Sequence, residues 1–335
     1  MDYMTSWSSR GPTYDGRTKP DIVAPGYNIY SANGNVGKDS CSTTDMAGTS
    51  MSAPIVAGNA ALVRQYFRDG YYPCGAKGCG ESITPSGSLV KAVLVNGAQK
   101  LRGVQSVPGG SVRSISEYDN TQNMGIVKLN RSLSLQGEND INTYIVNNKE
   151  IAVGETEFID IEINTNGRSV EEISVALVWY DPPTAAYCSN CIRNNLDLKV
   201  ERTRGESVVS TFHPNGLSRA DIKNTVERVR LNNVSHGETY RISVRAANFD
   251  DASQKYSLAL TGSFELAAVP IETSDPTKSP TATPSALPTK SPTPVPSALP
   301  TTTPSERPTK SPTTMPTVAH SSNPSASPTK SPTAT

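Results

Sequence analysis

One serine stands where a hydroxyl could act as a nucleophile. Gly48-Thr49-Ser50 is followed by small and aliphatic residues as far as Val63. Glycine permits a tight turn and serine is common at helix starts, so we expect a helix that begins close to Ser50. The positive end of its dipole would favour negative charge developing beside this hydroxyl. The apolar residues that follow predict that the helix is buried. Alternatively, Ser50 only caps the helix.

Two longer motifs resemble the subtilisin-like serine proteases (subtilases). Residues 48–58 resemble the motif around their serine nucleophile, and residues 8–32 resemble the segment that precedes it. Ser52 stands where the family usually has alanine. The resemblance implies a serine endopeptidase that cleaves peptide bonds through an acyl-enzyme on Ser50, with Thr49 and Gly48 supporting the oxyanion site.

The other members of the family's catalytic triad have no counterpart in the sequence. Subtilases carry their Asp and His before the Ser, whereas the three histidines, His213, His236 and His320, all follow Ser50. We read them as surface residues. The family's oxyanion Asn also belongs upstream. We therefore expect that the chain starts inside a catalytic domain, that Asp, His and Asn precede Met1, and that this fragment alone is close to inactive.

The elements around Ser50 predict the C-terminal part of an α/β domain. The first helix should end at Gly70, and a second is expected over residues 86–96, where apolar residues share one face. Residues 123–133 resemble the closing strand and short helix of the subtilase domain. We place this peptidase part at residues 1–135.

A second part, residues 140–266, changes to the period of two that is typical of strands. The alternating segments are residues 158–163, 173–179, 196–200, 226–231, 240–245 and 256–260. They predict a β-sandwich. Residues 177–183, 194–198 and 224–227 resemble the C-terminal jelly-roll domain of one subtilase subgroup. Such a domain could brace the catalytic part or bind a polymeric substrate.

No cofactor is required for the expected chemistry, but family members often bind calcium. Asp181, Asn195, Asp197 and Asp221 are oxygen donors near predicted strand ends. Ordinary polar turn residues explain them more simply, because no calcium-loop spacing is present. The metal therefore stays unassigned.

The cysteines indicate an oxidising compartment. Cys74 and Cys79, and Cys188 and Cys191, form two close pairs that we interpret as local disulfides in preference to a zinc site. Cys41 is left over and could pair upstream. Asn130-Arg131-Ser132 and Asn233-Val234-Ser235 are glycosylation sequons. Together these features favour a secreted or cell-surface protein whose signal peptide is not in this chain.

Residues 267–335 are rich in Pro, Thr and Ser, and Thr-Lys-Ser-Pro-Thr recurs four times. This composition predicts a disordered, O-glycosylated stalk or linker, which could attach to a cell wall or matrix. The formal net charge is zero, and the longest apolar run is too short to span a membrane. We therefore expect protein or peptide substrates and no nucleic acid. The alternative function is a non-catalytic secreted binding or structural module on a glycosylated stalk.

Overall fold

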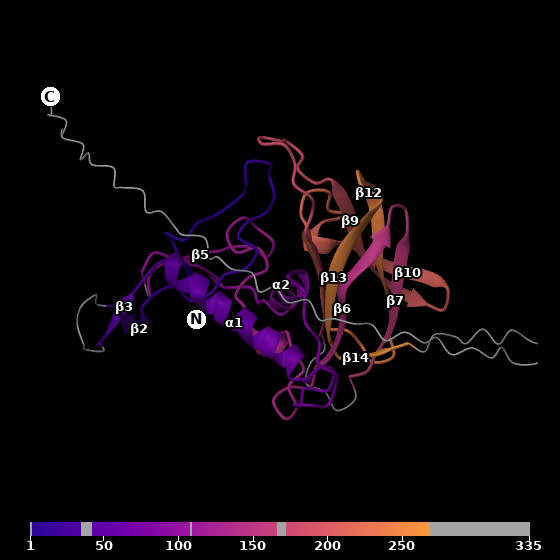
Figure 1. Cartoon of the computed structure of the whole chain (residues 1–335), viewed down its shortest axis with the longest axis horizontal. Coiled ribbons are helices and arrows are strands. Elements are labelled where there is room, and N and C mark those ends of the chain that lie inside the picture. Colours follow the sequence, from indigo (N-terminus) through magenta and orange to yellow (C-terminus); the bar gives the residue numbers. More distant parts are fainter. Residues whose placement is uncertain (1, 35–41, 108, 166–171, 268–335) are drawn as a thin grey trace, which may run out of the picture. The chain divides into compact units, whose positions relative to one another are not determined.

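The computed structural model describes residues 2–34, 42–107, 109–165 and 172–267. The peptidase part contains seven elements and a short 3-10 turn in chain order: β1 (Tyr3–Thr5), β2 (Ile29–Asn33), β3 (Ser42–Met46), α1 (Thr49–Arg68), α2 (Gly87–Asn96), β4 (Gly103–Gln105), β5 (Val112–Arg113) and η1 (Leu129–Arg131). Figure 1 shows α1 and α2 on one side and the later strands on the other.

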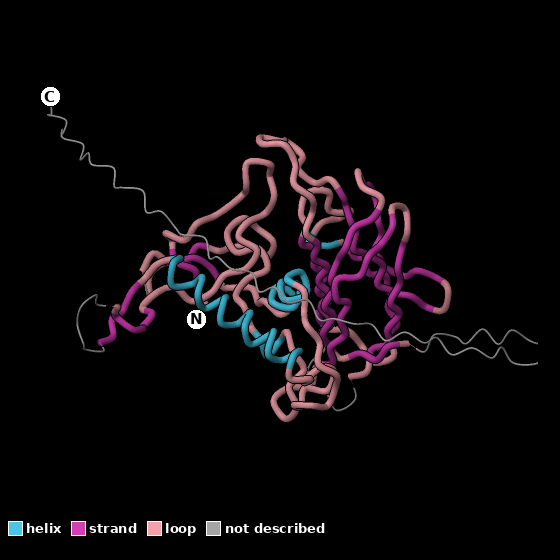
Figure 2. The backbone as a smooth tube through the Cα atoms, viewed as in Figure 1, coloured by secondary structure: helices cyan, strands magenta, loops and turns pink. Residues whose placement is uncertain are grey.

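The second part is built almost entirely of strands, as Figure 2 shows. Its elements are β6 (Asn142–Ala152), β7 (Thr156–Ile163), β8 (Glu172–Trp179), β9 (Asn194–Arg204), β10 (Ser207–Phe212), η2 (Pro214–Gly216), β11 (Val226–Asn232), β12 (Thr239–Phe249), β13 (Ser253–Gly262) and β14 (Phe264–Leu266). They form a five-stranded sheet, in the order β10-β9-β12-β7-β14, and a four-stranded sheet, in the order β11-β8-β13-β6. The pairs within both sheets are antiparallel.

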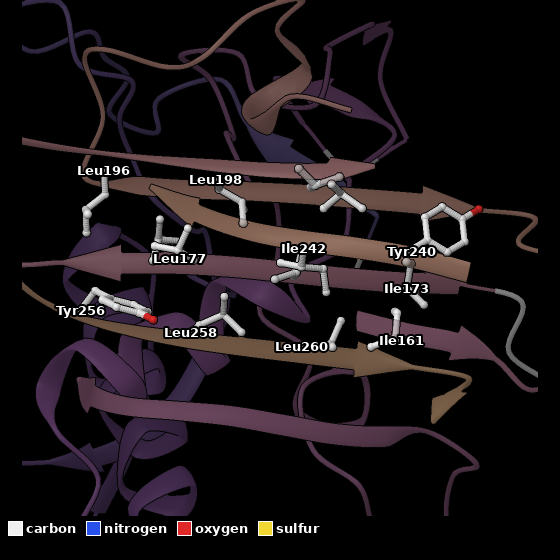
Figure 3. Packing of buried hydrophobic residues seen from close by; sticks show 14 of the residues in the cluster. Ile161, Ile173, Leu177, Leu196, Leu198, Tyr240, Ile242, Tyr256, Leu258 and Leu260 are labelled. Atoms are coloured by element: carbon white, nitrogen blue, oxygen red, sulfur yellow. The ribbon is translucent and has the colours of Figure 1, made fainter. Parts of the chain in front are cut away.

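An apolar core lies between these two sheets. Strand side chains alternate between faces, so every second residue of β8, β9, β12 and β13 enters this core. Figure 3 shows Leu177 and Leu258 of the four-stranded sheet with Leu198 and Ile242 of the five-stranded sheet. These four leucine and isoleucine side chains are fully buried. Their burial holds the two sheets together through the hydrophobic effect.

The other face of the four-stranded sheet is covered by α2. Ala176 and Val178 of β8 and Ala259 of β13 are buried against this helix. Small side chains on that face let the helix approach closely. Because both faces of β8 are covered, the strand is apolar along almost its whole length.

Hydrogen bonds fix both ends of α2 to the sheet. The Ser86 hydroxyl accepts from the N–H of Leu89 and so caps the first turn, and it also contacts the Ser257 hydroxyl of β13. At the other end, the Asn96 side-chain amide donates to Thr261, also of β13. The peptidase part and the two sheets therefore share one core and belong to one compact unit, Met1–Ile271.

A buried arginine of β11 completes this junction. Arg228 has no exposed side-chain surface, and its guanidinium donates to the carbonyls of Val95 and Ala98 at the end of α2, at 2.8 and 2.9 Å. It also donates to Glu117 and, at 3.3 Å, to the carbonyl of Met124. The last carbonyls of a helix lack partners within the helix, and a cation there is favourable.

The first helix is less buried than its sequence predicts. Only Val63, Tyr66 and Phe67 of α1 are buried among the described residues, all in its last turns, where the helix contacts α2. Ala53 and Ala57 are exposed, and Leu62 is 54% exposed. The expectation of a helix buried all round is therefore wrong for this chain, because no described residue covers this face.

The parallel sheet expected for an α/β domain is represented by short pieces. β1 pairs with β4 in parallel over three residues, and a parallel bridge joins Val23 to Ile126. Among the described residues, β1 pairs with β4 alone and so lies at an edge. By strand content the described chain is mostly β.

Both expected local disulfides are present, Cys74–Cys79 and Cys188–Cys191. Cys41, His320 and the repeats of residues 268–335 lie outside the described residues. No helix that the structure describes is long and apolar enough to cross a bilayer.

Candidate active site

Ser50 is the second residue of α1 and is exposed to solvent. Thr49, also exposed, begins the helix, and Gly48 occupies the N-cap position in an extended conformation. No side chain caps the helix, so the interpretation of Ser50 as a cap is wrong. Pro54 has no N–H to donate to the Ser50 carbonyl four residues earlier. Because Ser50 lies in the first turn of this 20-residue helix, its hydroxyl stands near the positive end of the helix dipole.

Two hydrogen bonds fix the turn that carries Ser50. The N–H of Gly48 donates to the carbonyl of Gly26 at 2.7 Å, and the Ser52 hydroxyl donates to the carbonyl of Ala24 at 3.0 Å. These contacts join the two motifs recognised in the sequence, since residues 24 and 26 belong to the first and residues 48 and 52 to the second.

In this turn, the backbone of Gly26 lies close to residues 48 and 52. A Cβ atom there would lie 2.3 Å from the Ser52 hydroxyl oxygen and 2.8 Å from the carbonyl oxygen of Gly48. A Cβ at Gly48 would meet nothing closer than 3.6 Å. Among the described neighbours, the steric requirement for glycine therefore falls on Gly26, and Gly48 is not needed for a tight turn.

The segment beneath Ser50 is itself held from both sides. The N–H of Val23 donates to the carbonyl of Gly125, and the N–H of Val127 donates to the carbonyl of Val23. Asp21 accepts from Lys19 and pairs with Lys91 of α2 at 2.9 Å. Burial raises the pKa of Asp21, but the Lys91 and Lys19 charges outweigh it, so the pKa lies below its ordinary value.

A small hollow of about 70 Å³ opens beside this turn. Its walls come from β1, the 23–27 segment and the start of α1. The lining includes Met4, Trp7, Val23, Tyr27, Thr49 and Ser52. Ser50 does not line it.

The described histidines lie in the strand-rich part of the chain. His213 directly precedes the η2 turn. His236 lies in the turn between β11 and β12. Neither appears among the residues that surround the Ser50 turn, so the described structure brings no imidazole to the candidate nucleophile.

Two of the four oxygen donors considered for calcium, Asp181 and Asp221, accept several hydrogen bonds within the protein. The Asp181 carboxylate accepts from the N–H groups of Arg193 and Asn194. The Asp221 carboxylate accepts from two N–H groups and from the side chains of Asn215 and Asn224. Within the described residues, no group of three or more acidic, His or Cys side chains is arranged to hold a metal. The four residues therefore stay unassigned to any metal.

Sequence reasoning missed two residues of this site, Ser52 and Gly26. The sequence alone assigns no role to Ser52, whereas its hydroxyl holds the turn. The signal was available, because a polar residue stands where the family usually has alanine. The need for glycine at position 26 depends on a contact with residues 48 and 52 and has no local signature.

Comparison with known proteins identifies a family that the first part of the chain resembles. Residues 1–128 match the subtilase family, peptidase S8. The first part of the chain is therefore similar to the subtilases. The match covers both motifs, the α1 and α2 helices and the Val23–Ile126 bridge, and it supports a serine protease of subtilisin type.

Individual relatives carry protease names. The serine protease/ABC transporter B family protein tagB of Dictyostelium discoideum is 28% identical over 307 residues, which cover 77% of this chain and 16% of that protein. Serine protease AprX of Bacillus subtilis is 41% identical over 108 residues, covering 30% of this chain and 21% of AprX. The PII-type proteinase of Lacticaseibacillus paracasei is 36% identical over 103 residues, 31% of this chain and 5% of that protein.

These alignments differ in extent. The tagB alignment covers more of the chain than the subtilase match alone, so it extends into the strand-rich part of this chain. The chain spans about a sixth of the length of tagB.

Proposed function

We propose that this chain supplies the nucleophile of a secreted serine endopeptidase and that Ser50 is that nucleophile. The main support for this proposal is that Ser50 is exposed at the start of α1. The turn that carries it is held by the Gly48–Gly26 and Ser52–Ala24 hydrogen bonds. A fixed, exposed hydroxyl at a helix N-terminus has the placement that nucleophilic catalysis needs.

The proposed reaction is acyl transfer. The Ser50 oxygen attacks a peptide carbonyl while a histidine takes its proton; the amine then leaves with that proton, and water releases the acyl group. The backbone N–H of Ser50 would donate to the oxyanion, with Thr49 and Gly48 shaping the same turn.

We propose that the Asp, the His and the oxyanion Asn come from polypeptide outside these 335 residues. Two observations support this proposal. The face of α1 that carries Ala53, Ala57 and Leu62 is exposed, and β1 offers an edge to a further parallel strand. Two of the relatives, tagB and the PII-type proteinase, are also several times longer than this chain. On this proposal the 335-residue chain alone lacks a general base and has little activity.

The strand-rich part is proposed to be a jelly-roll domain that braces the peptidase part. Its two antiparallel sheets and shared core support the sandwich, and Arg228 and the Ser257 and Thr261 contacts support the bracing role. Protein or peptide substrates follow from the family. Secretion is supported by the two disulfides. Attachment of the Pro-rich tail to a wall or matrix remains a further proposal.

The test is peptide hydrolysis by the longer gene product. Casein cleavage should be lost in Ser50→Ala, by roughly the 10⁶-fold in kcat that removal of this serine costs in subtilisin. Ser42→Ala, an exposed serine on β3, is the matched control and should cleave normally. Equal activity of Ser50→Ala and the parent would overturn the assignment. Absence of activity in the parent would favour the non-catalytic module.

A further inference from the structure

The two sequons of the chain lie in different structural settings. Asn130-Arg131-Ser132 overlaps the η1 turn of the peptidase part, whereas Asn233-Val234-Ser235 forms the start of the turn between β11 and β12. Transfer requires that the enzyme reaches both the asparagine amide and the hydroxyl two residues later, so a sequon that folds before transfer is used only where both groups stay accessible. In the folded chain, the β11–β12 turn meets this requirement and the η1 turn does not.

At the β11–β12 turn, both recognised side chains face solvent. Val234 is only 4% exposed and belongs to the core between the two sheets. Asn233 and Ser235, on either side of it, are exposed. The anchored valine thus holds the two recognised residues outward.

The backbone of this turn is well defined. Asn233 adopts a left-handed conformation with φ of 60°, which asparagine tolerates better than most residues. The N–H of Ser235, and not its hydroxyl, donates to the Glu238 carboxylate, and the N–H of Gly237 donates to the carbonyl of Ile163. These contacts fix the turn while leaving the Ser235 hydroxyl at the surface.

At η1, the hydroxyl of the sequon is inside the protein. Ser132 is fully buried, and its hydroxyl donates to the carbonyl of Lys128 at 3.1 Å. It packs on Gly97, where a Cβ would lie 2.1 Å from the Ser132 oxygen. The Asn139 side chain also donates to the Asn130 carbonyl. Recognition of this hydroxyl would require η1 to unfold and leave the end of α2.

We propose that Asn233 is the N-glycosylation site of this protein and that Asn130 stays unmodified. The acceptor is the Asn233 side-chain nitrogen, and the donor is a lipid-linked oligosaccharide of a secretory compartment. The nitrogen forms a bond to the anomeric carbon, and the bond from that carbon to the lipid diphosphate breaks. The diphosphate leaves with the bonding electrons, and the amide gives up one proton. This proposal is independent of catalysis by Ser50.

The test is site-resolved glycan mapping of the full chain. The chain is exported from a yeast host behind a heterologous signal peptide, treated with peptide N-glycosidase in heavy-oxygen water, digested and examined by mass spectrometry. Conversion to labelled aspartate is expected at Asn233 and not at Asn130. Peptide mapping separates this signal from O-linked sugars on the tail.

Three variants sharpen the test. Asn233→Gln and Ser235→Ala should each abolish the N-glycan, the second without altering the acceptor itself. Asn232→Gln, an exposed neighbour outside the sequon, should keep it. Label at Asn130 in the parent, no label at Asn233, or a glycan that survives Ser235→Ala would each overturn the proposal. If Asn233→Gln is not exported, Ser235→Ala and the parent decide the outcome.

Discussion

Replacement of Arg228 by methionine should destabilise the folded chain strongly. The substitution keeps an apolar stem of similar length and removes a guanidinium whose side chain has no exposed surface. It leaves the carbonyls of Val95 and Ala98 and the Glu117 carboxylate without this donor. Breaking a buried charge pair by removing one partner costs about 3–5 kcal/mol. We expect the free energy of unfolding of Arg228→Met to fall within that range.

Urea unfolding measures this loss directly. Trp179 is 1% exposed in the sandwich core, so its fluorescence should report the transition. With an m-value of about 3 kcal/mol/M, the midpoint should fall by about 1–1.7 M. Arg241→Met is the matched control, since Arg241 pairs with Asp160 at the surface at 2.7 Å. Exposed pairs contribute less than about 1 kcal/mol, so its midpoint should move little.

Arg228→Lys distinguishes geometry from charge. A lysine ammonium cannot reproduce the planar fork that reaches the α2 carbonyls and Glu117 together, so we expect only partial recovery. A midpoint of Arg228→Met equal to that of Arg241→Met would refute the reasoning that this arginine joins β11 to α2. Full stability of Arg228→Lys would refute the geometric part of it.

Two further predictions concern stability. Burial raises the pKa of Glu227 well above its ordinary value. The N–H of Leu198 lowers this pKa, whereas the charges of Asp221 and Asp197 raise it further. The carboxyl therefore keeps its proton in the folded chain above the pH at which the unfolded chain loses it. Its contribution to the free energy of unfolding is thus complete below about pH 4.5 and is lost as the pH rises through the folded pKa. Glu227→Gln should flatten this part of the pH dependence of the urea midpoint. An unchanged slope would contradict this prediction. Ser86→Ala removes the cap of α2 and should lower the free energy of unfolding by about 1–2 kcal/mol, whereas Ser82→Ala, at an exposed position before the helix, should change it little; equal midpoints for the two would contradict the capping role.

The strongly alternating or apolar strands could be predicted from sequence, and the weakly patterned ones could not. Residues 158–163, 173–179 and 240–245 all lie within β7, β8 and β12. β6 and β10 were missed, because β6 carries a polar run over residues 147–150 and β10 is short, and both lie at sheet edges. Their strand structure depends on pairing with distant neighbours.

For the candidate site, the local features were predictable and the long-range contacts were not. The helix start near Ser50 follows from residues adjacent in sequence, and α1 begins at Thr49. The contact of Ser52 with Ala24 and the packing of Gly26 join residues more than 20 positions apart. The burial of α1 was predicted wrongly. An apolar pattern indicates that a helix face is suited to packing, but the exposure of that face depends on the residues that surround it in the structure.

The most direct test of the account is labelling of Ser50 by a fluorophosphonate, which reacts with activated serine hydroxyls. The longer gene product is treated with the probe, digested and mapped by mass spectrometry, beside Ser50→Ala and the 335-residue chain alone. The account predicts one labelled serine, Ser50, in the longer product, and no label in the variant or in the chain alone. Labelling that persists in Ser50→Ala, or a longer product that is folded and unlabelled, would contradict it.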